Sequence, residues 1–273
     1  NYLKAKKKFF DDMPKNAFCL TNLDDKNGLV MMQNTKAKVY TYSLRSLSDF
    51  KGKILESHFE GMILNFNEKE LAVQFIGKFN ASNLLAVFGA ACLLGKKEED
   101  VLVALTTLRP VAGRFDSMRS SKGYTAIVDY AHNKLSFEKL FSAMKEEFPD
   151  YGLVAIFGCP GKKSLLRRKY LGTIAGQYSN MVYLVAEDPG YEPVEDISKE
   201  IAQYVEAQQC PYKMIEDRGE AIKDAIETAE GKTLLLVTGK GAETRQKYGC
   251  EYLDCPSDVE YVQRYLAEYD SRH

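Results

Sequence analysis

The chain has 273 residues, 45% of them hydrophobic, and a formal net charge of −1, which suits two globular domains and argues against a protein built to bind bulk nucleic acid or an anionic membrane. No apolar run approaches the roughly 20 residues that a membrane-spanning helix needs, and no apolar segment follows the lysine-rich start as it does in a signal peptide. The six cysteines never form a C-x-x-C pair, which favours a cytoplasmic protein with reduced thiols over a zinc site or a disulfide framework.

The first predicted element is an amphipathic helix over residues 4–11. The chain does not begin with methionine and no capping residue precedes this helix, so we expect the sequence to be a fragment of a longer protein. A short apolar strand over residues 17–21 runs into the polar stretch 22–28. Those polar residues mark either the carboxyl edge of a strand or an ordinary Asp/Asn/Gly turn.

Alternating residues and turns next predict a small β-meander followed by two helices. The strands are expected at residues 39–42, 53–59, 61–66 and 70–75, and the helices at 84–94 and 98–108. Asn80 and Asn83 are expected on the first turn of the first of these helices, whose residues 84–94 are nearly all apolar. Side-chain amides three residues apart lie on one helix face and can pair with the edge of a base, although an asparagine at a helix start is also a common cap.

Beyond Pro110 the pattern becomes a regular alternation of strands and helices. Strands are expected at residues 125–129, 153–157, 181–186, 213–215 and 233–237, and helices at 136–148, 165–178, 194–207 and 219–229. This alternation predicts a mostly parallel, doubly wound α/β sheet, in which ligands bind outside the carboxyl ends of the strands. Four of these ends lead into loops rich in glycine or charge, at residues 129–132, 158–163, 187–190 and 238–243. Loops are often polar, but four such loops at one sheet edge indicate a binding surface.

Single residues in these loops leave their roles open. Gly239-Lys240-Gly241 lacks the full G-x-x-x-x-G-K-[ST] pattern of a phosphate loop. His132 could be a general base, a stacking partner or an ordinary histidine at the sheet edge. The basic run 167–169 is either a solvated helix face or a grip for a carboxylate.

Eight segments, all in the same order, resemble the Mur ligase family, most closely its MurE type. They are Y-L-K-A-K-K-K-F-F, N-L-D-D-K-N-G, G-K-F-N-A-S-N-L-L, R-P-V-A-G-R-F-D, V-D-Y-A-H-N-K, F-G-C-P-G-K-K, E-D-P-G-Y-E-P and G-K-G-A-E. The resemblance implies two domains. Residues 1–112 would be the C-terminal part of a central ATP-binding α/β domain, and residues 113–273 a Rossmann-like C-terminal domain.

The resemblance also implies an ATP-dependent ligase of peptidoglycan synthesis. Such enzymes phosphorylate the terminal carboxylate of UDP-MurNAc-L-Ala-D-Glu, and the amine of a free diamino acid then attacks the acyl phosphate. Lys6 matches the lysine that the family carbamoylates, which turns a cation into an oxygen ligand for Mg²⁺. The whole protein is expected to be a cytoplasmic monomer. Because the phosphate loop is not found in this sequence, we expect the chain alone to be inactive.

The same motifs carry over two sets of site residues. Those matched to the nucleotide site are Asn80 and Asn83 for adenine, Arg114 near the nucleotide, Asp129 for the ribose, and Tyr130 and His132 in the same loop. Those matched to the amino-acid site are Arg168 for a carboxylate, Glu187, Asp188, Gly239 and Glu243.

One loop departs from the pattern of MurE enzymes that add diaminopimelate. In those enzymes the loop reads D-N-P-R, and its arginine binds the distal carboxylate, whereas here it reads Glu187-Asp188-Pro189-Gly190. Two acids without that arginine favour a cationic side-chain end. The expected substrate is therefore L-lysine, or ornithine, rather than diaminopimelate. A second departure is Ala242, where the family commonly has histidine.

Two other functions fit the same nucleotide residues. An amide ligase of the folylpolyglutamate or cyanophycin type would have a different acceptor pocket. A non-catalytic relative would use the same fold as a binding module.

Overall fold

The computed structural model describes residues 2–272, with only the backbone of Tyr2 included. Asn1 and His273, at which the two predicted domains begin and end, lie outside the described residues. The chain divides into two compact units, Asn1–Arg109 and Pro110–His273. The division follows Arg109, slightly before the expected boundary at residue 112.

The first unit is built on a mixed five-stranded sheet with the order β1-β2-β3-β4-β5. Its elements up to the end of the sheet are α1 (Tyr2–Asp11), β1 (Phe18–Asn22), α2 (Gly28–Met32), β2 (Lys38–Ser43), β3 (Phe50–His58), β4 (Gly61–Phe66) and β5 (Lys69–Val73). The predicted meander is confirmed for β3, β4 and β5, which are antiparallel neighbours. Strand β2 is not part of it, because it pairs in parallel with both β1 and β3.

Two helices, α3 (Lys78–Leu93) and α4 (Glu98–Thr107), complete this unit. Helix α3 begins at Lys78 and not at Leu84 as expected, because Gly77 turns the chain into the helix with a positive φ of 92°. Phe88 of α3 is fully buried, and its ring packs edge-on against Phe50 with centroids 5.9 Å apart. The apolar side chains of α3 thus pack on the strands of the sheet and form the core of the unit.

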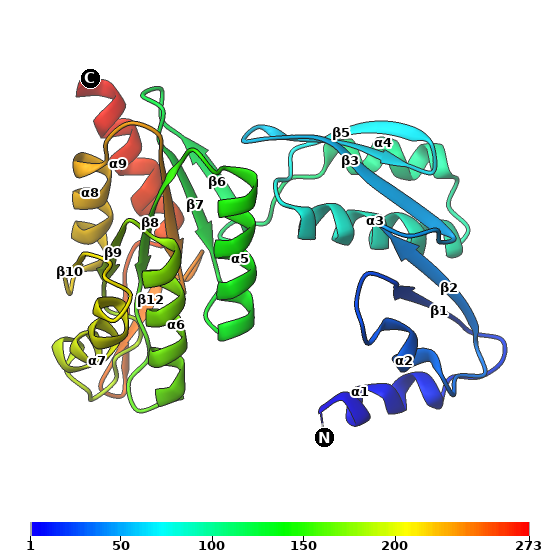
Figure 1. The fold of residues 1–273 in the computed structure, drawn as a ribbon, viewed down its shortest axis with the longest axis horizontal. Coiled ribbons are helices and arrows are strands. Elements are labelled where there is room, and N and C mark those ends of the chain that lie inside the picture. The colour runs from blue at the N-terminus through cyan, green and yellow to red at the C-terminus, as the bar shows by residue number, and fades with distance from the viewer. Residues whose placement is uncertain (1, 273) are drawn as a thin grey trace. The chain divides into compact units, whose positions relative to one another are not determined.

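The second unit is a six-stranded sheet with the order β10-β9-β8-β11-β7-β6. Its alternating elements are β7 (Thr125–Asp129), α5 (Lys134–Glu147), β8 (Gly152–Phe157), α6 (Leu165–Tyr178), β9 (Met181–Leu184), α7 (Val194–Glu206), β10 (Tyr212–Met214), α8 (Arg218–Thr228) and β11 (Thr233–Thr238). These strands are all parallel. Helices α8 and α9 (Asp258–Arg272) lie on one face of the sheet, and α5 and α6 lie on the other (Figure 1). The predicted doubly wound α/β fold is confirmed.

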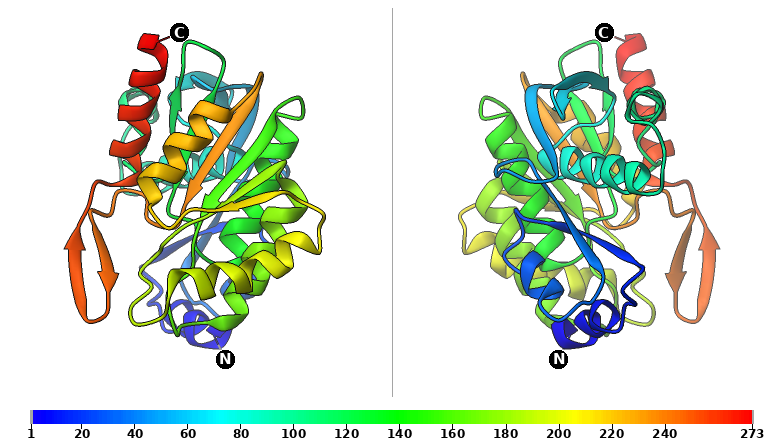
Figure 2. Two further views of the ribbon diagram at one scale, coloured as in Figure 1. Left: turned by 90° about the vertical axis from the view of Figure 1, so that its left-hand side faces the viewer. Right: turned by 90° about the vertical axis from the view of Figure 1, so that its right-hand side faces the viewer.

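Among the described residues, four elements of the second unit were not predicted. They are the antiparallel edge strand β6 (Asp116–Arg119), helix α9, and a hairpin made of β12 (Arg245–Tyr248) and β13 (Glu251–Asp254). The hairpin stands out from the six-stranded sheet, as the orange ribbon in Figure 2 shows. Its backbone is tied to Gly190, whose N–H donates to the Lys247 carbonyl at 3.1 Å and whose carbonyl accepts from Gly249 at 2.7 Å. The hairpin therefore belongs to the edge of the sheet at which ligands are expected.

Within residues 2–272, none of the helices combines the length and the apolar character that crossing a membrane would require.

Candidate functional site

A cavity of about 380 Å³ lies at the carboxyl edge of the six-stranded sheet, a volume within the usual range for small-molecule sites. All four predicted loops contribute to its lining, and so does the hairpin. The lining residues used below are Tyr130, His132, Lys162, Lys163, Arg167, Glu187, Asp188, Gly190, Tyr191, Gly239, Lys240, Glu243, Lys247, Gly249, Cys250 and Tyr252. The expected convergence of the loops follows from the parallel strands, whose carboxyl ends meet at one edge.

Glu187 forms the floor of the cavity and is paired with Arg167. Glu187 is 6% exposed, and its Oε1 accepts from Arg167 Nη2 at 2.5 Å. Burial raises the pKa of Glu187 to about 7, against the opposing effect of the Arg167 charge. Gly239 allows this arrangement, because its φ is +107° and a Cβ there would lie 2.4 Å from Glu187 Oε2.

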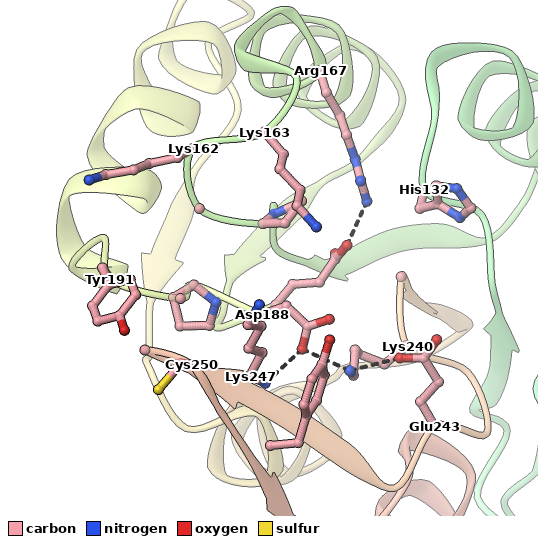
Figure 3. Close-up of a pocket in the computed structure, with 18 of the residues that line it drawn as sticks. His132, Lys162, Lys163, Arg167, Asp188, Tyr191, Lys240, Glu243, Lys247 and Cys250 are labelled. Atoms are coloured by element: carbon pink, nitrogen blue, oxygen red, sulfur yellow. Dashed lines mark hydrogen bonds and ion pairs between the residues drawn. The ribbon is translucent and has the colours of Figure 1, made fainter.

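Asp188 and Glu243 are held together by Lys240 (Figure 3). The Lys240 ammonium group is buried and lies 3.0 Å from Asp188 Oδ1 and 2.8 Å from Glu243 Oε2. Burial lowers the pKa of Lys240, but hydrogen bonds to Glu243 and Asp188 outweigh it, so that the net pKa shift is upward. Glu243 also accepts a hydrogen bond from the Tyr130 hydroxyl at 2.5 Å. All three acids of the cavity are therefore already paired with protein cations.

This pairing removes the reason for expecting lysine as the substrate. The expectation assumed that Glu187 and Asp188 would be available to a cationic side-chain end, but Arg167 and Lys240 occupy them. Five cationic side chains line the cavity against three acids. Among the described residues, Lys163 and Lys247 have no carboxylate partner.

The residues matched to the nucleotide in this unit lie side by side. Each Asp129 oxygen accepts from a backbone amide, that of Phe115 at 2.8 Å and that of Ala131 at 2.7 Å. Burial raises the pKa of Asp129, opposed by these amides and by the Arg114 charge. The Arg114 guanidinium lies 4.5 Å from the centre of the Tyr130 ring. These contacts fix the loop, and the prediction that Asp129 and Arg114 bind a nucleotide stays a prediction.

His132 is held by its own loop. Its Nδ1 lies 2.9 Å from the Tyr130 carbonyl, and its ring packs edge-on against the Tyr130 ring at 5.1 Å. His132 also lines the cavity. This geometry is compatible with the stacking role and with the role of a positioned base.

Arg168 is placed differently from what was expected. Its side chain is 1% exposed and does not line the cavity. The guanidinium binds Glu192 through Nη2 at 2.7 Å and Glu200 through Nη1 at 2.5 Å, and side-chain hydrogen bonds to Glu192 raise its pKa further. A substrate carboxylate cannot reach it without displacing these acids. Its neighbour Arg167 is the arginine that lines the cavity.

Asn80 and Asn83 lie inside α3 in the first unit, so neither of them caps the helix. Asn80 Nδ2 donates to the Ile76 carbonyl at 2.8 Å, while Asn83 is exposed. Lys6 is exposed on α1. In the part of the chain that the structure describes, no three His, Cys, Asp or Glu side chains gather as a metal site. The adenine and magnesium roles of these residues stay predictions.

The hairpin supplies the lining residues that sequence reasoning missed. They are Lys247, Gly249, Cys250 and Tyr252, with Tyr191 from the loop that they contact. The segment carries one usable signal, because Gly249-Cys250 between two short polar runs is a possible two-residue hairpin turn. Its strands are mostly exposed and show no apolar alternation.

Fold and cavity together define an α/β protein whose C-terminal sheet presents a charged small-molecule site. Two family models match the chain: the Mur ligase middle domain over residues 1–91 and the Mur ligase glutamate ligase domain over residues 113–241. The chain belongs to the Mur ligase family.

Relatives and solved structures agree with this assignment. A protein of Bacteroides fragilis named UDP-N-acetylmuramoyl-L-alanyl-D-glutamate–2,6-diaminopimelate ligase is 58% identical over 248 residues, covering 90% of this chain and 51% of that protein. One of the same name from Caldanaerobacter subterraneus is 30% identical over 98% of this chain and 55% of that protein. The chain thus spans about half the length of the curated relatives it matches.

Two solved structures have a similar fold. A structure of a 2,6-diaminopimelate ligase of this type superposes with a TM-score of 0.66 and 26% identity, covering all of this chain and 57% of that one. MurF ligase from Thermotoga maritima in complex with ADP gives a TM-score of 0.65 at 16% identity, covering 99% of this chain and 58% of that one. The second likeness concerns the fold alone.

Proposed function

We propose that the whole protein is an ATP-dependent ligase that adds a diamino acid to UDP-MurNAc-L-Ala-D-Glu. The supporting observation is the strand-end cavity, which is lined by paired acids and unpaired lysines within a Mur ligase C-terminal domain. The γ-phosphoryl group of ATP passes to the substrate carboxylate and ADP leaves. The amine of the diamino acid then attacks the acyl carbon, an amide bond forms, and phosphate departs.

We further propose that the diamino acid is diaminopimelate, in place of the lysine expected from the loop sequence. Two observations support this change. The cavity has more cations than acids, and its acids are paired, so a ligand with a second carboxylate is favoured electrostatically over one with net positive charge. In addition, the relatives described above carry diaminopimelate in their names.

For the nucleotide, the expected residues are Asn80 and Asn83 in the first unit and Arg114 and Asp129 in the second. We propose that ATP binds these residues with Mg²⁺. A carbamate on the exposed Lys6 would offer oxygen to the metal, which neutralises phosphate charge when bound. Since a carbamate supplies only part of the six oxygen ligands that Mg²⁺ prefers, nucleotide phosphates and water would provide the others.

The test is amino-acid-dependent phosphate release by the full-length protein with ATP, Mg²⁺ and UDP-MurNAc-L-Ala-D-Glu. Diaminopimelate, L-lysine, L-ornithine and L-glutamate are compared at equal concentration. We expect release with diaminopimelate to exceed release with the others at least tenfold. A preference for lysine would restore the original expectation, and a preference for glutamate would favour a folylpolyglutamate-like activity. No release with any of them would refute the ligase.

A further inference from the structure

We propose that Lys247, on the hairpin, is a specificity-determining residue whose ammonium group binds the second carboxylate of the incoming amino acid. The inference rests on the proposed function and names the side chain that distinguishes a dicarboxylic from a monocarboxylic diamino acid. Four features of the structure support it: the direction of the side chain, its anchoring, the lack of an acidic partner among the described residues, and a second lysine across the cavity.

The direction follows from strand alternation in β12. Lys247 lines the strand-end cavity, whereas its neighbours Gln246 and Tyr248 line a separate cavity of about 200 Å³. Successive side chains of a strand point to opposite faces. The position of Lys247 in β12 therefore directs its side chain toward the strand-end cavity, in which the amino acid is proposed to bind.

The anchoring comes from the backbone of the same residue. The Lys247 N–H donates to Asp188 Oδ1 at 2.9 Å, and its carbonyl accepts from the Gly190 N–H at 3.1 Å. Gly190 has a positive φ of 61° and carries no side chain. Lys247 therefore places a cation beside residues 187–190, a loop segment that contains no lysine or arginine.

The charge of Lys247 is available to a ligand. Its ammonium group lies 5.6 Å from the centroid of the Tyr252 ring, and Tyr252 is its cross-strand neighbour. Lys240, by contrast, lies between two carboxylates. A cation over an aromatic face keeps its N–H donors free for an anion.

The second lysine indicates which anion is bound. Figure 3 shows Lys163, on the loop before α6, and Lys247 on opposite walls of the cavity, while Lys162 points away. Two separated and unpaired ammonium groups match a ligand with a carboxylate at each end, and a ligand with one carboxylate leaves one of them unmatched. The same view places His132 on the side away from the hairpin. Lys247 therefore faces the end of the amino acid farther from the nucleotide residues.

The test uses Lys247→Met and Lys247→Arg in the full-length protein. The matched control is Lys232→Met, since Lys232 also lies over a tyrosine ring, that of Tyr151 at 6.0 Å, but outside the cavity. For each variant, KM and kcat are measured with diaminopimelate and with L-lysine. The affinity for each amino acid is also measured by calorimetry in the presence of UDP-MurNAc-L-Ala-D-Glu and a non-hydrolysable ATP analogue.

We expect Lys247→Met to raise KM and Kd for diaminopimelate on the order of tenfold to a hundredfold, as the loss of a charge-assisted hydrogen bond does. The values for lysine should change less than about twofold. Lys247→Arg should keep most of the affinity, and Lys232→Met should match the wild type.

The outcomes separate the two proposals. If the wild type uses diaminopimelate but Lys247→Met weakens both amino acids equally, or neither, the role of Lys247 is refuted and the proposed function stands. If the wild type neither binds nor uses diaminopimelate, the role of Lys247 and the proposed diaminopimelate substrate are both refuted, and release with another amino acid would leave the ligase itself standing.

Discussion

Arg167 and Arg168 are neighbours on helix α6 with opposite surroundings. Arg167 reaches into the strand-end cavity and pairs with Glu187 on its floor. Arg168 is buried behind the cavity, between Glu192 and Glu200. The difference teaches that a charge in a functional loop or helix is available to a ligand only if the protein has not already paired it. The same distinction separates Lys240, which is paired, from Lys247.

The largest effect on stability is expected from Arg168→Met in the full-length protein. Removing the cation leaves Glu192 and Glu200 close together without the arginine charge that both of them bind, which costs about 3 kcal/mol of unfolding free energy. The KM for the amino acid should stay unchanged. Urea unfolding followed by far-ultraviolet circular dichroism measures the stability, and phosphate release measures the KM for the amino acid.

Lys199→Met is the control for that experiment, because Lys199 pairs with Glu195 on the surface and exposed pairs contribute little. If Arg168→Met raised the KM for the amino acid and left the stability unchanged, Arg168 would belong to the binding site. That result would contradict the contrast drawn between Arg167 and Arg168.

The burial of Glu187 should make the stability of the protein depend on pH. Its pKa in the folded protein, about 7, is above the ordinary value, so the folded state binds the extra proton. The contribution of Glu187 to stability is therefore largest below about pH 5 and falls by about 2 kcal/mol as pH rises from about 5 to 7. Glu187→Gln should remove this slope. Thermal unfolding of both proteins across this pH range measures it, and identical slopes would contradict the account.

A smaller effect is expected from the glycine that lets Glu187 approach. Gly239→Ala should cost about 1 kcal/mol more than Gly123→Ala, because both positions have positive φ but only the first added Cβ meets Glu187. Gly123 has open space around it. Denaturant midpoints of the two variants give the difference. Equal costs would mean that the Glu187 side chain moves aside freely.

The smallest loss is expected from Arg167→Met at pH 6, less than about 1 kcal/mol, because Glu187, with a pKa of about 7, already carries a proton at that pH and does not depend on the arginine charge. At pH 8 the loss should be larger. Unfolding free energies at the two pH values test this, and a loss at pH 6 as large as that of Arg168→Met would remove the contrast between the two arginines.

The parallel sheet and its four loops could be predicted because β7, β8, β9 and β11 are apolar runs that each end in glycine or charge. Parallel strands then bring those ends together whatever the details of packing. The hairpin could not be predicted in the same way. Its residues are largely exposed and it is held by backbone hydrogen bonds to Gly190, which leave no apolar pattern.

Charge pairing was the other feature beyond sequence reasoning. Nothing in the run 167–169 distinguishes the arginine that faces Glu187 from the one that faces Glu192, since adjacent helix positions differ only in direction. The acids of the loop after β9 likewise suggested a cation site, because their partners Arg167 and Lys240 lie far away in the sequence. The start of α3 was misplaced because Gly77 lacks the side chain of a usual cap.

The most direct test of the cavity assignment is a crystal structure of the full-length protein with diaminopimelate and a non-hydrolysable ATP analogue. We predict that the amino acid lies in the strand-end cavity with its second carboxylate about 3 Å from Lys247 Nζ, while Arg168 remains bound to Glu192 and Glu200. An amino acid bound elsewhere, or one whose carboxylate displaces those acids from Arg168, would contradict the account.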